Sequence, residues 1–170
     1  MSVLAVVAEA RSLLGRTLHG HGVAVRITEV EAYDGPNDPA SHAFTRTARS
    51  EIMFGEPWRL YVYRSYGMHF CANVVTGVEG QASAVLVRAG EVVDGEDIAR
   101  ARRGPSTKHE RLARGPGNLA RALGLTLDDL GSDLLATEGV RLGSPVDSQP
   151  AISVGPRVGV SKAADLPWRF

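Results

Sequence analysis

Two glutamates and a tyrosine stand at alternate positions where an apolar run ends, in the stretch ITEVEAYDGPNDPASH at residues 27–42. Since side chains alternate between the two faces of a strand, an unbroken strand over residues 23–33 would carry on one face Val23, Val25, Ile27, Glu29, Glu31 and Tyr33. Carboxylates on an apolar face are costly unless they are paired or used in chemistry. The alternative is that the end of the strand leaves the core and both acids face water.

A second group of candidates is aromatic, in the stretch LYVYRSYG at residues 60–67. Tyr61 and Tyr63 share a face by their spacing of two, and tyrosines on strands commonly pack in a core. Tyr66 instead falls at the tip of a predicted hairpin, and such tips generally face water. An aromatic residue at a tip can insert as a wedge into a stack of bases.

An arginine interrupts the apolar stretch AVLVRAG, where Arg88 follows Ala84 and Leu86 in the same register. One interpretation is an edge position from which the guanidinium group reaches solvent. The other is a pocket in which the guanidinium group lies opposite a carboxylate such as Glu31. The spacing alone leaves both open.

Basic residues gather in a chain whose formal net charge is zero. Between Asp97 and Arg121 there are seven lysines or arginines and two acids, a net charge of +5. This segment is either a solvated basic loop or a surface that contacts phosphates. The candidates for contact with a phosphate backbone are Arg100, Arg102, Arg103, Lys108, Arg111 and Arg114.

The elements that would position these residues fit one domain over residues 1–170. Helical spacing of apolar residues predicts a first helix that ends at Gly15, through Val3, Leu4, Val7, Ala10, Leu13 and Leu14. Further along we expect a strand at about 22–33, a long loop, a hairpin over 59–77, a strand over 83–93, a short helix after GPGN, and a tail with short β-like pieces. Mostly hairpin-connected strands with few helices predict the α+β class with a largely antiparallel sheet.

The composition excludes several classes of protein. With 44% hydrophobic and 22% charged residues, the chain is typical of a globular protein. Cys71 is the one cysteine, so no internal disulfide forms, and its apolar surroundings favour a packing role. The opening residues have no basic segment typical of a signal peptide, and no run reaches the length that spans a membrane. We therefore expect a cytoplasmic protein with no membrane partner.

Five blocks of sequence together resemble a known family. EVEAYDGPNDPASH, MFGEPWRLYVYRSYGMHFCANVVT, AVLVRAGEV, GPGNLARALGL and GPRVGV occur in this order. They closely resemble the alkyladenine (3-methyladenine) DNA glycosylase family, the Mpg type, from about residue 9 to the end of the chain. The resemblance implies one mixed domain around a curved, open-barrel-like antiparallel sheet flanked by helices.

The resemblance also implies a reaction, the hydrolysis of the N-glycosidic bond of damaged purines flipped out of double-stranded DNA. Glu31 matches the family's general base, which activates the attacking water. Arg88 matches an arginine that helps to hold this water, and Val158 matches a residue whose backbone carbonyl does the same. An alkylated, cationic base is already a good leaving group, so one carboxylate can suffice where ordinary glycosidases need two. Glu29 is then expected to be structural.

The same resemblance assigns the residues around the base. Tyr33, His42 and Tyr63 match the aromatic walls of the base pocket, and electron-rich tyrosine faces favour a cation. Asn73 matches a residue at the rim that disfavours normal guanine by clashing with its amino group. Tyr66 matches the tyrosine that fills the gap left in the duplex.

Further expectations concern cofactors, partners and the course of the reaction. No metal and no other cofactor is expected, although Glu31, Asp38 and His42 form a less favoured candidate metal site. Lys108 and Lys162 lie in polar stretches outside the matched pocket blocks. Without an amine nucleophile in the pocket, we expect a monofunctional hydrolase with no lyase step. The expected state is a monomer that associates with the nucleoid through DNA.

The sequence also allows an alternative function, and one of its loops departs from the family pattern. The alternative function is a catalytically silent module that binds lesions with the same aromatic pocket. The segment TRTARSEIMFG carries Ala48 and Ser50 where the family often has proline and asparagine, so the conformation of this DNA-facing loop stays open.

Overall fold

A curled, antiparallel sheet of six strands, shaped as a half-barrel, organises the described residues, 3–148 and 150–170, of the computed structural model. Its strand order is β3-β4-β5-β2-β1-β6. The strands are β1 (Thr17–Gly20), β2 (Val23–Tyr33), β3 (Leu60–Ser65), β4 (His69–Thr76), β5 (Ser83–Asp94) and β6 (Arg141–Leu142). The helices are α1 (Val3–Leu13), α2 (Glu96–Arg103) and α3 (Pro116–Leu123), with 3₁₀ turns at Gly35–Asn37, Glu51–Phe54, His109–Arg111 and Leu127–Asp129. The predicted α+β class is confirmed.

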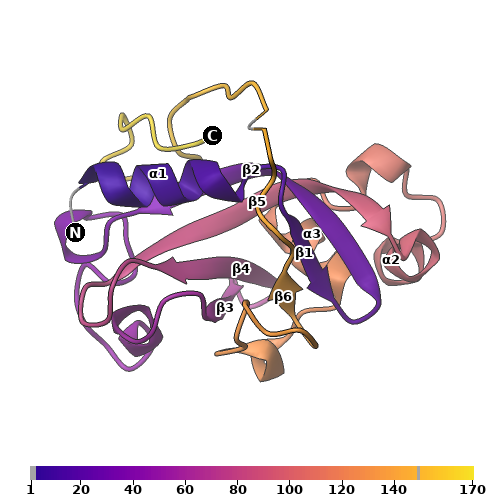
Figure 1. Ribbon diagram of the computed structural model, residues 1–170, viewed down its shortest axis with the longest axis horizontal. Helices are drawn as coiled ribbons and strands as arrows, with labels where there is room; N and C mark the ends of the chain where they lie inside the picture. Colours follow the sequence, from indigo (N-terminus) through magenta and orange to yellow (C-terminus); the bar gives the residue numbers. More distant parts are fainter. Residues whose placement is uncertain (1–2, 149) are drawn as a thin grey trace.

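The core lies between one face of the sheet and the helices. Leu13 of α1 and Leu119 and Leu123 of α3 are fully buried in the same apolar cluster as the inward residues of the strands. Each such leucine stabilises the fold by about 1.5–3 kcal/mol. In Figure 1, α1 and α2 lie at opposite ends of the molecule, joined by the long strands β2 and β5.

Strand β2 is not the unbroken alternating strand expected from its sequence. Its pairing with β5 changes register between Ile27 and Val30, so Val23, Val25 and Ile27 face the core before the bulge and Val30 and Ala32 face it afterwards. A bulge adds one residue and turns the following side chains to the other face. The expectation that Glu31 and Tyr33 share a face with Val23, Val25 and Ile27 was therefore wrong.

A glycine on the neighbouring strand allows this distortion. Gly90 of β5 pairs with Ile27, and a Cβ atom at Gly90 would lie 2.3 Å from a methyl carbon of Val25 and 2.5 Å from the carbonyl oxygen of Arg26. No larger residue fits between the bent strands. The bent pairing is thus accommodated by a glycine more than sixty positions away in sequence.

Other elements agree with the sequence in part. The first helix, the hairpin of β3 and β4, strand β5 and the helix after GPGN are present as predicted. Strand β1 was missed, and the basic segment expected as a loop begins with helix α2. The tail forms isolated bridges instead of strands. Val30 of β2 exchanges two backbone hydrogen bonds with Phe170, and the N–H group of Ala32 donates to the carbonyl oxygen of Trp168.

Candidate active site

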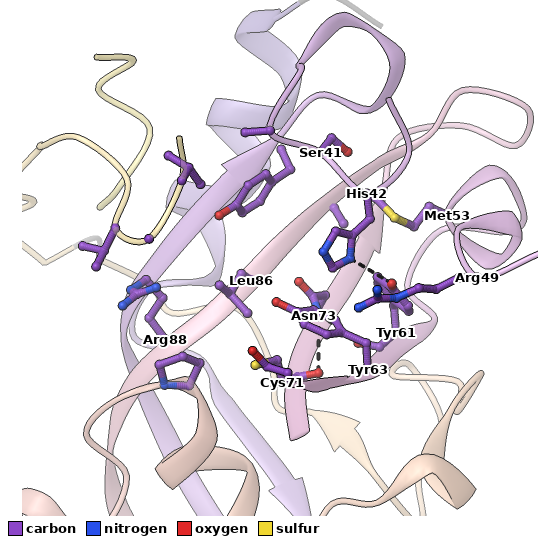
Figure 2. Close-up of a pocket in the computed structure, with 18 of the residues that line it drawn as sticks. Ser41, His42, Arg49, Met53, Tyr61, Tyr63, Cys71, Asn73, Leu86 and Arg88 are labelled. Atoms are coloured by element: carbon purple, nitrogen blue, oxygen red, sulfur yellow. Dashed lines mark hydrogen bonds between the residues drawn. The ribbon is translucent and has the colours of Figure 1, made fainter. Parts of the chain in front are cut away.

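A cavity of about 630 Å³ opens on the face of the sheet opposite the core. Alternation along three adjacent strands provides its floor. The residues that line it from β3, β4 and β5 are Tyr61, Tyr63, Cys71, Asn73, Ala84, Leu86 and Arg88, whereas their neighbours Val62, Ala72, Val85 and Val87 belong to the core. Figure 2 shows Arg88 at one end of the cavity and His42, Tyr61 and Arg49 at the other, with Leu86 and Asn73 between them.

Glu31 lies behind the wall of this cavity, fully buried. One carboxylate oxygen, Oε2, accepts a hydrogen bond from the hydroxyl group of Tyr33 at 2.8 Å. The other, Oε1, accepts one from the backbone N–H of Val158 at 2.7 Å and lies 3.4 Å from a guanidinium nitrogen of Arg88. The structure thus brings together the residues that the resemblance assigned to chemistry, but Val158 contacts the glutamate through its N–H group.

The Tyr33 hydroxyl group is held in its protonated form. Burial raises its pKa well above the ordinary value, and the charge of Glu31 together with their hydrogen bond raises it further. At neutral pH the hydroxyl group therefore keeps its proton and donates a hydrogen bond to the carboxylate. Tyr33 both lines the cavity and orients Glu31.

Arg88 is paired with Glu29, the other glutamate of β2. Its Nε donates to Oε1 of Glu29 at 2.9 Å, and Glu29 also lies 3.6 Å from a guanidinium nitrogen of Arg169. The Arg88 side chain is only 14% exposed and lines the cavity, so the interpretation as a solvated edge residue was wrong. The contacts of Glu29 agree with the structural role expected for it.

An aromatic cluster forms the far wall. The His42 and Tyr63 rings meet edge to face with centroids 4.6 Å apart, and Nδ1 of His42 lies 3.0 Å from the hydroxyl oxygen of Tyr61. Burial, with a smaller effect from the Arg49 charge, lowers the pKa of His42. His42 is therefore neutral at physiological pH and carries one donor and one acceptor nitrogen.

Asn73 and Tyr66 both line the cavity. The Asn73 amide nitrogen donates to the backbone oxygen of Tyr61 at 3.1 Å, which fixes the amide at the cavity floor. Tyr66 stands at the hairpin tip with φ +49°, and it is 92% exposed. Met68 is 75% exposed in the same turn. Two large apolar side chains thus project into solvent beside the mouth of the cavity.

Comparison with known proteins agrees with this geometry. A family model described as methylpurine-DNA glycosylase (MPG) matches residues 3–170. The chain belongs to this family. A relative from Nocardia farcinica is 55% identical over 170 residues, which cover 95% of this chain and 80% of the relative. Relatives from Mycolicibacterium fortuitum (53%, covering 95% and 86%) and Mycobacterium leprae (51%, covering 96% and 79%) are similar. Each carries the name of an inferred 3-methyladenine DNA glycosylase.

As a methylpurine-DNA glycosylase family member, the chain is an enzyme of the hydrolase class. The structure adds cavity residues that sequence reasoning missed. Tyr61 shares a face with Tyr63, as its spacing predicted, but was not assigned to the pocket, and Arg49 comes from the loop whose sequence departs from the family pattern. The Arg49 guanidinium group lies 5.0 Å from the centroid of the Tyr63 ring. Lys162 also lines the cavity, which corrects the expectation that both lysines lie away from it.

A second, basic cavity of about 710 Å³ lies between α2 and α3. Its residues include four of the six predicted backbone contacts, Arg103, Lys108, Arg111 and Arg114. The other two bind groups of the protein itself. Arg100 pairs with Glu96 at 2.6 Å, and Arg102 donates to the carbonyl oxygens of Ala122 and His21 at 3.0 and 2.7 Å.

The three candidate metal ligands are each bonded to a different partner within the protein. Asp38 is paired with Arg157, His42 contacts Tyr61, and Glu31 is bonded as described above. Within residues 3–148 and 150–170, no three histidine, cysteine or acidic side chains are placed to hold a metal ion. In the same part of the chain, no helix has the length and apolar character needed to cross a membrane.

Proposed function

We propose that this enzyme removes purines of the 3-methyladenine type from double-stranded DNA by hydrolysis of the N-glycosidic bond and leaves an abasic site. The observation that carries the proposal is the buried Glu31 carboxylate, held by Tyr33, Val158 and Arg88 at the edge of an aromatic cavity. This arrangement places a general base, held in a fixed position, next to a slot that can take a planar purine ring. Such purines arise from alkylation, so the proposed process is base excision repair.

The exposed hairpin tip provides the means to extrude a base. A base inside a duplex cannot reach a cavity in a protein, and its extrusion costs roughly a few kcal/mol. Tyr66, which projects from the tip, is the residue that would fill the vacated stack. The extruded base would then enter between Tyr33, His42 and Tyr63, which line one cavity.

The pocket would favour lesions in two ways. A cationic alkylated purine on a tyrosine face gains about 0.5–2 kcal/mol relative to a neutral base. A neutral His42 can offer a hydrogen bond to uncharged lesions such as hypoxanthine or ethenoadenine. Asn73, fixed by its bond to Tyr61, would clash with the amino group of normal guanine.

Bond cleavage builds positive charge on the sugar, which the Glu31 carboxylate stabilises while it takes a proton from the attacking water. Each oxygen of Glu31 accepts one hydrogen bond in this structure. Each can accept a second one, so water can approach Oε1 beside the Val158 N–H group, which lies on an irregular, half-exposed segment. We place the water between Oε1 of Glu31 and Arg88, with the Val158 carbonyl group as a third ligand.

The basic cavity would bind the DNA backbone. Lys108, Arg111 and Arg114 are exposed there, and α3 begins next to them. Cationic side chains that neutralise phosphates supply affinity without sequence preference. The proposed partner is thus the duplex around the lesion, bound by a monomer in the cytoplasm at the nucleoid.

The resting geometry also favours a second candidate, a silent lesion-binding module. Glu31 is fully buried and both of its oxygens are bonded, as expected of a structural acid. The two functions differ in one measurement, because only an enzyme releases the base.

The test is single-turnover release of the base from a duplex that contains hypoxanthine and from a methylated duplex. We expect Glu31→Gln, which keeps the shape of the side chain, to slow release at least about 100-fold. The matched control is Glu79→Gln in an exposed loop, which should behave as wild type. DNA strands should stay intact at the abasic site, although Lys162 lines the cavity.

Each other outcome has a clear reading. Tight, lesion-selective binding by wild type without release would support the binding module. Equal release by wild type and Glu31→Gln would remove Glu31 from its assigned role. Strand cleavage abolished by Lys162→Ala would contradict a monofunctional reaction.

A further inference from the structure

A fully buried ion pair lies behind one wall of the cavity. The Arg157 guanidinium group donates to both carboxylate oxygens of Asp38, at 2.5 and 3.0 Å, and neither side chain is exposed. Arg157 also donates to the carbonyl oxygens of Ala32 at 3.0 Å and Ala163 at 3.3 Å. These contacts fix the position of the charge within the protein.

The guanidinium group lies against the ring of Tyr33. Its central carbon is 4.6 Å from the centroid of that ring and 5.2 Å from the centroid of the Trp168 ring. Tyr33 lines the cavity, whereas Arg157 is not among the residues that line it. The Tyr33 ring therefore separates a permanent cation from the space in which a base would stack.

We propose that Asp38 determines how strongly the Tyr33 wall attracts cationic bases, because it neutralises the arginine behind that wall. The inference rests on the proposed function. A tyrosine ring attracts a cation through the negative charge of its face, and Arg157 already occupies the rear face. A second cation on the front face would feel both the polarised ring and the repulsion of Arg157. The Asp38 carboxylate cancels most of that repulsion.

Distance makes the effect large enough to measure. A base stacked roughly 3.5 Å from the ring would lie about 8 Å from the guanidinium carbon on the far side. At an effective dielectric constant of about 20, one unit charge at that distance changes an equilibrium or a rate about tenfold or more. Burial protects the interaction from screening by salt.

The ratio of two lesions isolates this effect from other consequences of mutation. A 3-methyladenine base is cationic when bound and leaves neutral, whereas hypoxanthine is neutral when bound and leaves with developing negative charge. The two bases therefore differ by one unit of charge in the bound state and in the transition state alike. Loss of stability or of general activity lowers both rates and leaves their ratio unchanged.

The experiment is a series in which the charge behind the wall changes by one unit at each step. Wild type carries a neutral pair, Asp38→Asn leaves one positive charge, Arg157→Gln leaves one negative charge, and the double variant is neutral again. For each we would measure kcat/KM for release of 3-methyladenine from methylated duplex and of hypoxanthine from a defined duplex. Circular dichroism and thermal melting would confirm that each variant is folded.

We expect the ratio of the two kcat/KM values to fall about tenfold in Asp38→Asn, to rise about tenfold in Arg157→Gln, and to return near the wild-type value in the double variant. If Asp38→Asn does not fold, Arg157→Gln and the double variant still compare a charged and an uncharged residue 38 in one background. A ratio that stays constant across the folded variants would overturn the proposal. No release of either lesion by wild type would instead remove the proposed function.

Discussion

The largely buried arginines at the aromatic cavity and the exposed cations of the basic cavity differ in whether they are paired with carboxylates. At the aromatic cavity, the two largely buried arginines next to Glu31 and Tyr33 have carboxylate partners: Arg88 has Glu29 and Glu31, and Arg157 behind the wall has Asp38. In the basic cavity, Lys108, Arg111 and Arg114 are exposed, and no carboxylate of the described residues lies within ion-pair distance of them.

This difference suggests separate roles for the two cavities, one in positioning reacting groups and the other in affinity for DNA. A buried, paired arginine is held at one position and can orient a carboxylate or a water molecule. An exposed, unpaired cation holds no fixed geometry, but it attracts phosphates over a distance and releases counterions when it binds them. We therefore expect the aromatic cavity to control the rate of the chemical step and the basic cavity to control the binding of DNA.

The largest effect should follow from Arg88→Met, which keeps the length of the side chain but removes its charge. Glu31 would lose the guanidinium group at 3.4 Å, and Glu29 would lose its partner at 2.9 Å. We expect single-turnover release to slow about 100-fold, because such charge-stabilising donors contribute roughly 10²–10³-fold. Rapid-quench measurement at saturating enzyme reports the rate.

The control for Arg88→Met is the affinity of the same variant for lesion-containing duplex, measured by fluorescence anisotropy. Affinity should stay within a few-fold of wild type. A variant that releases the base normally but binds DNA weakly would reverse the assignment of the two cavities.

A smaller effect of the opposite kind should follow from replacing both Arg111 and Arg114 with alanine. Each lost phosphate contact lowers the slope of log affinity against log salt concentration by about 0.9, so the double variant should lose about two units of slope. The rate at saturating enzyme should not change. The matched control is Arg26→Ala, a half-exposed arginine paired with Glu91, which should leave the slope unaltered.

The contrast also explains what could be predicted from sequence. The pairing of Glu31 with Tyr33 is local, two residues apart on one strand, and it was visible in the alternation. The bulge in β2 was not predicted, although the apolar positions of VAVRITEVEAY change phase between Ile27 and Val30, and Gly90 on another strand leaves room for it. Helix α2 was missed because its eight residues bury one apolar side chain, Ala99, and offer no apolar stripe. Its acidic first turn and basic last turn complement the helix dipole instead.

The remaining members of the site depend on folding of distant segments. Arg88 and Val158 were assigned only through the resemblance to a family, because no spacing relates residues 31, 88 and 158. Arg157 and Arg49 touch the aromatic walls from segments that are irregular or in short turns. Irregular segments carry no periodicity, so their contacts are not readable from a single sequence.

The smallest expected effect concerns pH. The pKa of His42 is lowered, first by burial and then by the charge of Arg49, so the folded protein resists protonation at this residue. In the unfolded chain His42 has the ordinary pKa of about 6.5. As the pH falls below about 6.5, the unfolded state therefore gains protons before the folded state does, and stability is lost; above that pH His42 contributes no dependence.

Thermal melting of wild type and His42→Gln between pH 5 and 8 should show a steeper acid-side loss of stability in wild type, by at most a few °C. Arg49→Met should reduce the same slope in part, since it removes the second cause, whereas identical slopes in all three proteins would show that His42 is not held neutral. Variants in the basic cavity should leave the slope unchanged, because the pKa of His42 depends on burial and on Arg49 within the aromatic cavity.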